Sequence, residues 1–500
     1  MKELVSQSKE ISHEYCCTVV KIGEVKPIEG SDFLGQTLVN GLSIVVRKDM
    51  VKEGDYMFYA ANETQLNLDF LSVNNQYEFS ERQLNANADE VIKLYEESEK
   101  LRNAGKIEEA DTVYNKAKSM VGFFGKNGRV KMIKLRGCPS MGYLFGLDSM
   151  ITWCPLMKEF NMEENEGMDF DTVNGEKFIC AYVPPIKENQ RADRAAKRNK
   201  KLRAFDRMIP GQFSFHYDTQ QLNREIGRIK PTDNVTISVK LHGTSVIIGN
   251  IKVKVPKFKG LYSKIFNWLP GFLQFTNEGY DVVYSSRTVI KNSKINSKVT
   301  SGFYGADVWA TYYELLKDKI PEGMTIYGEI VGYVTDSNTM IQKGYDYKCL
   351  PGKNQLMIYR ISQKVYDEEL GYEKNVEWNV KEVYVWTKLL IEQYPELKDY
   401  IHPIDILYEG TLADLYPEIS TTEHWHENVL EAMKNDTVHF GMEKNEPLCR
   451  NKTPREGIVL RINDDPINEA FKLKCISFLS KEAKMIDEGE VDIELEQGRY

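Results

Sequence analysis

The sequence predicts an α+β protein with a small β-rich module followed by a larger domain of strands and helices. Three observations support this fold class. Short apolar strands with glycine turns dominate the first part of the 500-residue chain. Helical periodicity replaces them between about residues 80 and 120, and strands alternate with helices from about residue 205 onward. This length exceeds what one hydrophobic core supports, so we expect more than one domain.

The first module is predicted to be a small OB-like β-barrel spanning residues 1–185. Its strands are expected at Tyr15–Ile22 and Leu42–Arg47, with a turn and a third strand within Lys52–Ala60. Short strands separated by 8 to 12 residues with glycine turns are typical of small barrels.

A helical hairpin is expected as an insertion near residues 82–120. Ala86–Ser98 and Ile107–Met120 have helical periodicity and flank the break at Asn103–Gly105. The β pattern resumes at Gly128–Gly137, where basic residues at 129, 131 and 134 alternate with apolar ones. Such a strand has a positive outer face that either binds a phosphate backbone or is merely solvated.

A basic linker is predicted at residues 186–204, between this module and a domain of residues 205–500. From Lys187 to Arg203 the chain has eight basic and two acidic residues, although the whole chain has a net charge of −9. This stretch is either an electrostatic steering element or a solvated helix. In the larger domain, helices are expected at Ala306–Lys317 and at Thr422–Lys434, the second with a threonine cap.

The composition is that of a globular cytoplasmic protein. Hydrophobic residues make up 42% and charged residues 28% of the chain, and no apolar run approaches the length of a membrane span. The first ten residues lack the apolar stretch of a signal peptide. Eight cysteines occur without a CxxC pair, which favours reduced thiols over disulfides or zinc. We expect a monomer without membrane contact.

The most informative segment is Lys240-Leu241-His242-Gly243, which follows the alternating run Val235–Val239. A lysine at a strand end can point its amine into a pocket, and a nearby glycine leaves room for a ligand. By itself the tetrapeptide also fits an ordinary turn with its lysine in solvent.

Five later segments supply the other side chains that a nucleotidyl transfer needs. Arg287 at a strand end can hold a phosphate or ribose oxygen, Glu329 is a carboxylate in an apolar strand, and Tyr359 offers a face for a base. Glu456 precedes a glycine, and Lys472 and Lys474 share one face of a strand. The segments are SSR at 285–287, YGEIVG at 327–332, MIYR at 357–360, REGIVLR at 455–461 and FKLK at 471–474.

In this order the six segments resemble motifs I, Ia, III, IIIa, IV and V of the covalent nucleotidyltransferases, the superfamily of RNA ligases, DNA ligases and capping enzymes. Histidine at position 242, where aspartate is commoner, resembles the RNA ligase 2-like branch. Members of that branch often have glutamate just before the nucleophile, where this chain has Val239. The upstream β module and Ile209–Asp218 resemble RNA ligases with an N-terminal OB domain. The resemblance implies an adenylyltransferase domain of antiparallel sheets and helices around a nucleotide cleft.

The resemblance also implies a role for each site residue. Lys240 would be the nucleophile that takes AMP from ATP, with His242 and Gly243 beside the nucleotide. Arg287 and Glu329 would hold the ribose and phosphate side, and Tyr359 would stack on adenine. Lys472 and Lys474 would hold the α-phosphate, and Glu456, with Glu329, would help to bind Mg²⁺ or Mn²⁺. A free lysine has a pKa of about 10.4, so neighbouring cations would be needed to deprotonate Lys240.

The implied activity is ATP-dependent joining of RNA 3′-OH and 5′-phosphate ends through a lysyl-AMP and an adenylylated 5′ end. Only about 25 residues follow Lys474, whereas DNA ligases and capping enzymes usually continue into a C-terminal OB domain. Three alternatives stay open: a GTP-dependent capping guanylyltransferase, a ligase acting on DNA, and a non-catalytic RNA-binding protein on this scaffold.

Overall fold

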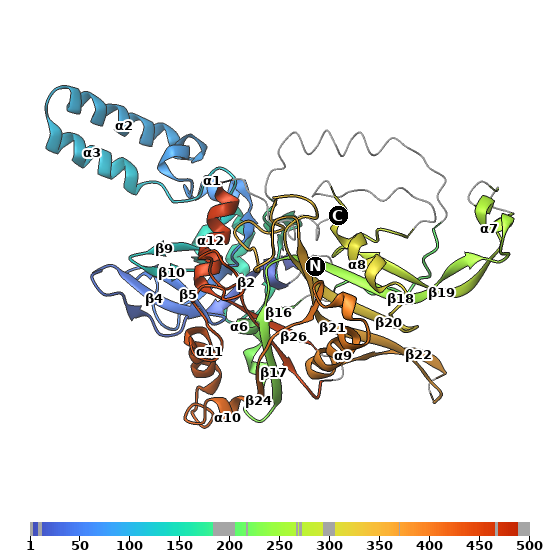
Figure 1. The fold of residues 1–500 in the computed structure, drawn as a ribbon. Helices are drawn as coiled ribbons and strands as arrows, with labels where there is room; N and C mark the ends of the chain where they lie inside the picture. Colours follow the sequence, from blue (N-terminus) through green and yellow to red (C-terminus); the bar gives the residue numbers. More distant parts are fainter. Residues whose placement is uncertain are drawn as a thin grey trace. The chain divides into compact units, whose positions relative to one another are not determined.

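The computed structural model describes residues 4–8, 13–183, 206–216, 219–266, 269, 273–293, 306–369, 371–465 and 469–488. The chain divides into two compact units, Met1–Val183 and Pro184–Tyr500. Both units combine antiparallel sheets with helices (Figure 1), which confirms the α+β class. The predicted basic linker, residues 186–204, lies outside the described residues.

The described residues of the first unit form five small sheets. Its β-strands are β1 (Val5–Ser6), β2 (Cys17–Lys21), β3 (Lys26–Pro27), β4 (Leu34–Val39), β5 (Leu42–Arg47), β6 (Tyr56–Ala60), β7 (Thr64–Leu66), β8 (Arg129–Val130), β9 (Ile133–Leu135), β10 (Cys138–Ser140), β11 (Tyr143–Phe145), β12 (Asp169–Phe170), β13 (Thr172–Val173), β14 (Glu176–Lys177) and β15 (Ile179–Ala181). The longest run has the order β11-β6-β2-β12, and none of these sheets closes into a barrel within the described part of the unit. The predicted OB barrel is therefore not seen as such.

Helices α1 (Leu68–Val73) and α4 (Leu147–Trp153) pack on the core of this unit through Phe70, Leu71 and Met150. Helices α2 (Ala88–Asn103) and α3 (Ile107–Ser119) form an antiparallel hairpin (Figure 1). Gly105 has a φ of 78° at the turn between them, a conformation that favours glycine.

One sequence expectation in this unit is wrong. The basic segment is not one strand, because β8 and β9 are separated at Lys131 and Met132. Arg129 does not belong to a positive outer face: its side chain is 2% exposed and its guanidinium pairs with Glu63 at 2.8 Å. An arginine without a partner would be costly to bury, so the carboxylate draws Arg129 inward. Lys131 and Lys134 are exposed.

Where the structure describes the second unit, its strands form two sheets. A five-stranded sheet has the order β16-β26-β25-β17-β24, with β16 (Gln220–Gln221), β17 (Asn234–Lys240), β24 (Ile406–Thr411), β25 (Gly457–Ile462) and β26 (Ala470–Lys474). The other sheet has the path β19-β18-β20-β21-β22, with β18 (Thr244–Pro256), β19 (Thr276–Ser285), β20 (Met324–Gly332), β21 (Asn354–Asp367) and β22 (Tyr372–Glu377). Strand β23 (Ile401–Pro403) pairs with β21 in parallel.

Helices cover the apolar faces of both sheets. Val308, Trp309, Tyr312 and Leu316 of α8 (Val308–Leu316) and Val383 and Leu390 of α9 (Val380–Gln393) pack on the larger sheet. Val429, Leu430 and Met433 of α11 (Trp425–Asn435) and Phe478 of α12 (Ile476–Asp487) pack in the core that includes the apolar residues of β17, β25 and β26. Shorter helices are α6 (Leu222–Glu225), α7 (Leu261–Ile265) and α10 (Leu412–Leu415).

Two helices of the second unit, α11 and α8, differ in how their N-termini are capped. Helix α11 begins later than expected, with His424 at its N-cap and no side-chain cap, so the predicted threonine cap at Thr422 is wrong. Thr422 instead donates its hydroxyl hydrogen to the carbonyl of Ile419. Helix α8 is capped by Asp307, whose carboxylate accepts from the amides of Trp309 and Ala310.

Candidate active site

The polar face of the five-stranded sheet carries a group of cations. Strand β17 alternates buried apolar residues Val235, Ile237 and Val239 with residues of the opposite face, Thr236, Ser238 and Lys240. Register places Lys240 opposite Gly457 on β25 and Gly457 opposite Lys474 on β26. Cross-strand partners point to the same face. Lys240 and Lys474 therefore flank one glycine from two sides.

Gly457 is required between the two lysines. Its φ is 152°, and a Cβ built on it would lie 2.0 Å from the carbonyl oxygen of Leu473. Any side chain would collide with the neighbouring strand and fill the space over which the lysines extend. This explains why glycine follows Glu456.

Glu456 joins the cations into one cluster. Its Oε1 lies 2.7 Å from Lys240 Nζ and 3.7 Å from Lys474 Nζ, and its Oε2 lies 3.9 Å from His242 Nδ1. Glu456 is 3% exposed. Burial raises the pKa of this carboxyl, but the charges of Lys240, Lys474 and His242 outweigh burial and leave the pKa below its ordinary value. The carboxylate is therefore held in its charged form.

The segment Lys240–Gly243 crosses from one sheet to the other. β17 ends at Lys240 in the five-stranded sheet, and β18 begins at Thr244 in the larger sheet. The Gly243 amide donates to Glu329 Oε1 on β20 at 3.0 Å. A Cβ on Gly243 would lie 2.4 Å from the carbonyl oxygen of Ile330, so glycine permits this close approach. Glu329 thus holds the crossing in place.

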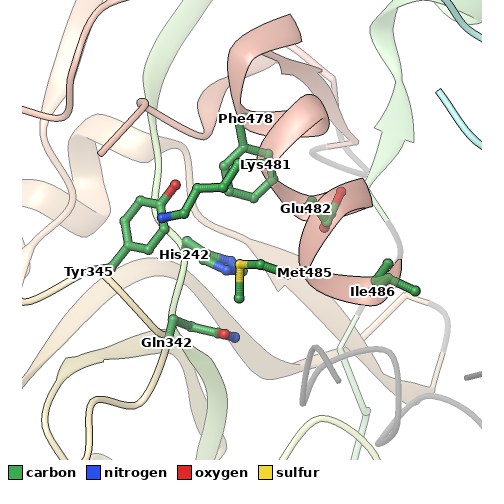
Figure 2. A pocket seen from close by; sticks show the side chains of 8 residues that line it. All are labelled: His242, Gln342, Tyr345, Phe478, Lys481, Glu482, Met485 and Ile486. Carbon is green, nitrogen blue, oxygen red and sulfur yellow. The ribbon is translucent and has the colours of Figure 1, made fainter. Parts of the chain in front are cut away.

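Two other residues hold the crossing segment. The Tyr347 hydroxyl accepts a 2.8 Å hydrogen bond from the His242 amide, and Gln342 Nε2 donates to the Gly243 carbonyl at 2.8 Å. The His242 ring is 7% exposed and meets the rings of Tyr345 and Phe478 edge-on, each at 5.0 Å. Figure 2 shows His242 in a pocket beside α12.

The remaining predicted residues lie on neighbouring strands. Lys472 is opposite Val459 and lies two residues before Lys474, on the same face of β26; we call this the cationic face of the sheet. Tyr359 occupies a bulge in β21, where the pairing with β20 passes from Arg360 to Ile358. Its ring lies 5.9 Å from the ring of His216 and 6.0 Å from the guanidinium of Arg461. Arg287 is half-buried two residues beyond the end of β19.

Arg461 is a residue to which the sequence analysis gave no role. It is opposite Thr236 on the cationic face, is 4% exposed, and its Nε has no hydrogen-bond partner among the described residues. Burial and the charge of Arg360 lower the pKa of Arg461 to about 10. Side chains alternate between the two faces of a strand, so Arg461 lies on the same face of β25 as Gly457. This alternation, read from the sequence, could have identified Arg461 as a residue of the site.

Residues 233–474 match the sequence model of the RNA ligase family. No curated protein sequence matches the chain. One similar solved structure is a mutant RNA ligase of Naegleria gruberi with ATP and Mn, at 15% identity and a TM-score of 0.50, covering 93% of this chain and 98% of that one. Another mutant, with AMP and Mn, has 17% identity and a TM-score of 0.49 over 93% and 98%. At this identity the likeness is one of fold.

Proposed function

We propose that this chain is an RNA ligase, which joins RNA ends with ATP through a covalent adenylate on Lys240; the match of residues 233–474 to the RNA ligase model supports this. The observation that carries the proposal is the cluster of Lys240, Lys474 and Glu456 at the strand ends of one sheet. A lysine nucleophile flanked by a second cation is what transfer of a nucleotide to an amine requires.

In the first step Lys240 Nζ attacks the α-phosphorus of ATP. A P–N bond forms, the bond from this phosphorus to the bridging oxygen of the β-phosphate breaks, and pyrophosphate leaves. Lys240 must first lose a proton, and Glu456 Oε1 at 2.7 Å is positioned to accept it. Lys474 and Lys472 lie on the same face and would neutralise charge on the α-phosphate.

The two later steps move AMP onto RNA and off again. The 5′-phosphate oxygen of the RNA attacks the lysyl-AMP phosphorus, and the P–N bond breaks. The 3′-hydroxyl then attacks the 5′-phosphorus, a phosphodiester forms, and AMP leaves. In the proposed assignment, Tyr359 stacks on adenine, with Arg461 beside it, and Arg287 and Glu329 contact the ribose side.

The donor set also fits a divalent cation such as Mg²⁺ or Mn²⁺. Glu456 Oε2 is buried and has no hydrogen-bond partner in the described part of the chain. Within those residues no group of three or more His, Cys, Asp and Glu could hold a metal alone. Magnesium ions are commonly bound by one or two carboxylates together with substrate phosphates and water. When bound, the cation would neutralise charge on the triphosphate.

The first unit is proposed to contact the RNA substrate. Lys131 and Lys134 are exposed near its β9–β10 pair, where they can meet backbone phosphates. The OB-like reading of this unit stays a proposal. No helix among the described residues is long and apolar enough to traverse a bilayer.

The deciding experiment incubates the full chain with ATP labelled at the α-phosphate and Mg²⁺, then denatures it. We expect a label that survives denaturation and is absent from Lys240→Ala. Lys381→Ala is the matched control, because Lys381 is 65% exposed on α9 in a pair with Glu409. Label retained by Lys240→Ala would disprove the assignment. Labelling by GTP in preference to ATP, with no joined RNA, would favour the capping reading.

A further inference from the structure

Helix α12, which begins two residues after Lys474, is fixed against the active site by contacts at its N-terminus and one turn later. At its N-terminus the Glu443 carboxylate accepts hydrogen bonds from the amides of Ile476 and Ser477. One turn later Lys481 donates to Thr453 Oγ1 at 2.7 Å, and its ammonium lies 4.1 Å from the centre of the Tyr345 ring. These contacts leave α12 little freedom to shift along its axis or to rotate.

The same helix presents Glu482 to the cation beside the proposed nucleophile. Lys474 Nζ lies 3.2 and 3.5 Å from the two oxygens of Glu482. On its other side Lys474 reaches Glu456 Oε1 at 3.7 Å. Its ammonium also lies 5.0 Å from the centre of the Phe478 ring. Lys474 is thus held by two carboxylates: Glu456, which directly precedes β25, and Glu482 on α12.

The pair of Lys474 and Glu482 is shielded from solvent. The side chains are 21% and 14% exposed, whereas ion pairs at the surface are usually weak because water and salt screen them. Figure 2 shows Glu482 on α12 among the side chains that line the pocket with His242 and Tyr345. A shielded pair can fix the position of a flexible lysine side chain.

We propose that Glu482 is a positioning residue for nucleotidyl transfer, which holds the Lys474 ammonium beside Lys240 so that both can meet one phosphate. This inference rests on the proposed function. Glu482 does not touch Lys240 itself. It acts through Lys474. The lysine side chain has four rotatable bonds, and the pair with a carboxylate on a fixed helix restricts its position.

The contacts of Lys474 predict which kinetic quantity responds to Glu482. Lys474 pairs with Glu456 at 3.7 Å and with Glu482 at 3.2 Å. Without the Glu482 carboxylate, the Lys474 ammonium loses one of its two partners and is less often in the position to meet the phosphate. We therefore expect weaker use of ATP, seen as a higher ATP concentration for half-maximal rate.

The test uses the full chain and measures single-turnover adenylylation against ATP concentration, which gives the half-maximal ATP concentration and the maximal rate separately. Glu482→Ala removes both the charge and the hydrogen-bond acceptor, and we expect the ATP concentration for half-maximal rate to rise about 10-fold. Glu482→Gln keeps a hydrogen-bond acceptor and should stay within about 3-fold of the unaltered chain. Glu488→Gln is the matched control, because Glu488 is an exposed carboxylate at the end of the same helix.

The outcomes separate this inference from the proposed function. If the unaltered chain takes no label from ATP, the proposed function fails. If it is labelled and Glu482→Ala matches Glu488→Gln in the ATP concentration for half-maximal rate, the positioning role is wrong. Should Glu482→Ala fail to fold, Glu482→Leu decides, because leucine keeps the bulk of the side chain and removes both oxygens: an unchanged ATP dependence overturns the proposal.

Discussion

Glu456 Oε1 lies 2.7 Å from Lys240 Nζ, and the same oxygen lies 3.7 Å from Lys474 Nζ. One buried carboxylate therefore balances the charge of the proposed nucleophile and of its neighbour. The arrangement keeps two cations together in the absence of nucleotide, since without Glu456 they would repel each other in a poorly solvated site.

Lys240→Arg is expected to abolish adenylylation as completely as Lys240→Ala. Arginine can keep the ion pair with Glu456, but its guanidinium stays protonated and cannot attack phosphorus. The measurement is label retained after denaturation, and a thermal unfolding scan confirms that the variant folds. Adenylylated Lys240→Arg protein would show that another residue carries the nucleotide.

Glu456→Gln should destabilise the second unit by about 3 kcal/mol at pH 7, because two partly buried lysines lose a fully buried counter-charge. The pKa of Glu456 is lowered on folding, so its contribution is complete above its ordinary value of 4.5 and is lost as pH falls through the lower folded value. Urea unfolding of both proteins should give a difference that is constant near pH 7 and shrinks below about pH 4.5. A difference that grows with acid would contradict this assignment.

Gly457→Ala should reduce adenylylation at least about 10-fold without removing any charged group, because its Cβ would lie 2.0 Å from the Leu473 carbonyl oxygen. The strand must shift, and Lys240 and Lys474 shift with it. Gly227→Ala is the control, since its Cβ would meet no atom within 4 Å. The two variants are compared by labelling rate and by unfolding temperature. Equal rates would mean that the spacing between β25 and β26 does not matter for the chemistry.

Deletion of residues 1–183, the first compact unit, should leave adenylylation within about 3-fold of the full chain and lower RNA sealing by at least about 10-fold. All the proposed nucleotide contacts belong to the second unit. Labelling and joining are measured on the same protein samples. Undiminished joining would assign the first unit another role.

Lys131→Ala combined with Lys134→Ala should weaken RNA binding and lower the slope of log affinity against log salt by about 1 to 2, since each phosphate contact releases counterions. Lys116→Ala combined with Lys118→Ala removes the same charge from exposed positions on α3 and is the control. Equal slopes for the two double variants would remove these lysines from the RNA contact surface.

Several elements could be predicted from local pattern alone. Leu42–Arg47 is a strand with the bounds that its apolar run suggested, and the hairpin of α2 and α3 turns at the expected glycine. Local chemistry also misled: Arg129 fits a basic strand face, but Glu63, 66 residues earlier, pairs with it in the interior. A distant partner of this kind leaves no trace in a short window of sequence.

The sequence by itself determined the order of the six motifs, the α+β class and the alternation that puts Ser238 and Lys240 on one face of a strand. Tertiary structure decided which of these side chains meet. Register between β17, β25 and β26 brings Lys240 and Lys474 to either side of Gly457, although more than 200 residues separate the two lysines in the chain. Packing of α12 brings Glu482 to Lys474, and packing of β25 near β21 buries Arg461 beside Tyr359. Period and propensity act within a few residues, whereas pairing across a sheet and burial of charge depend on the whole fold.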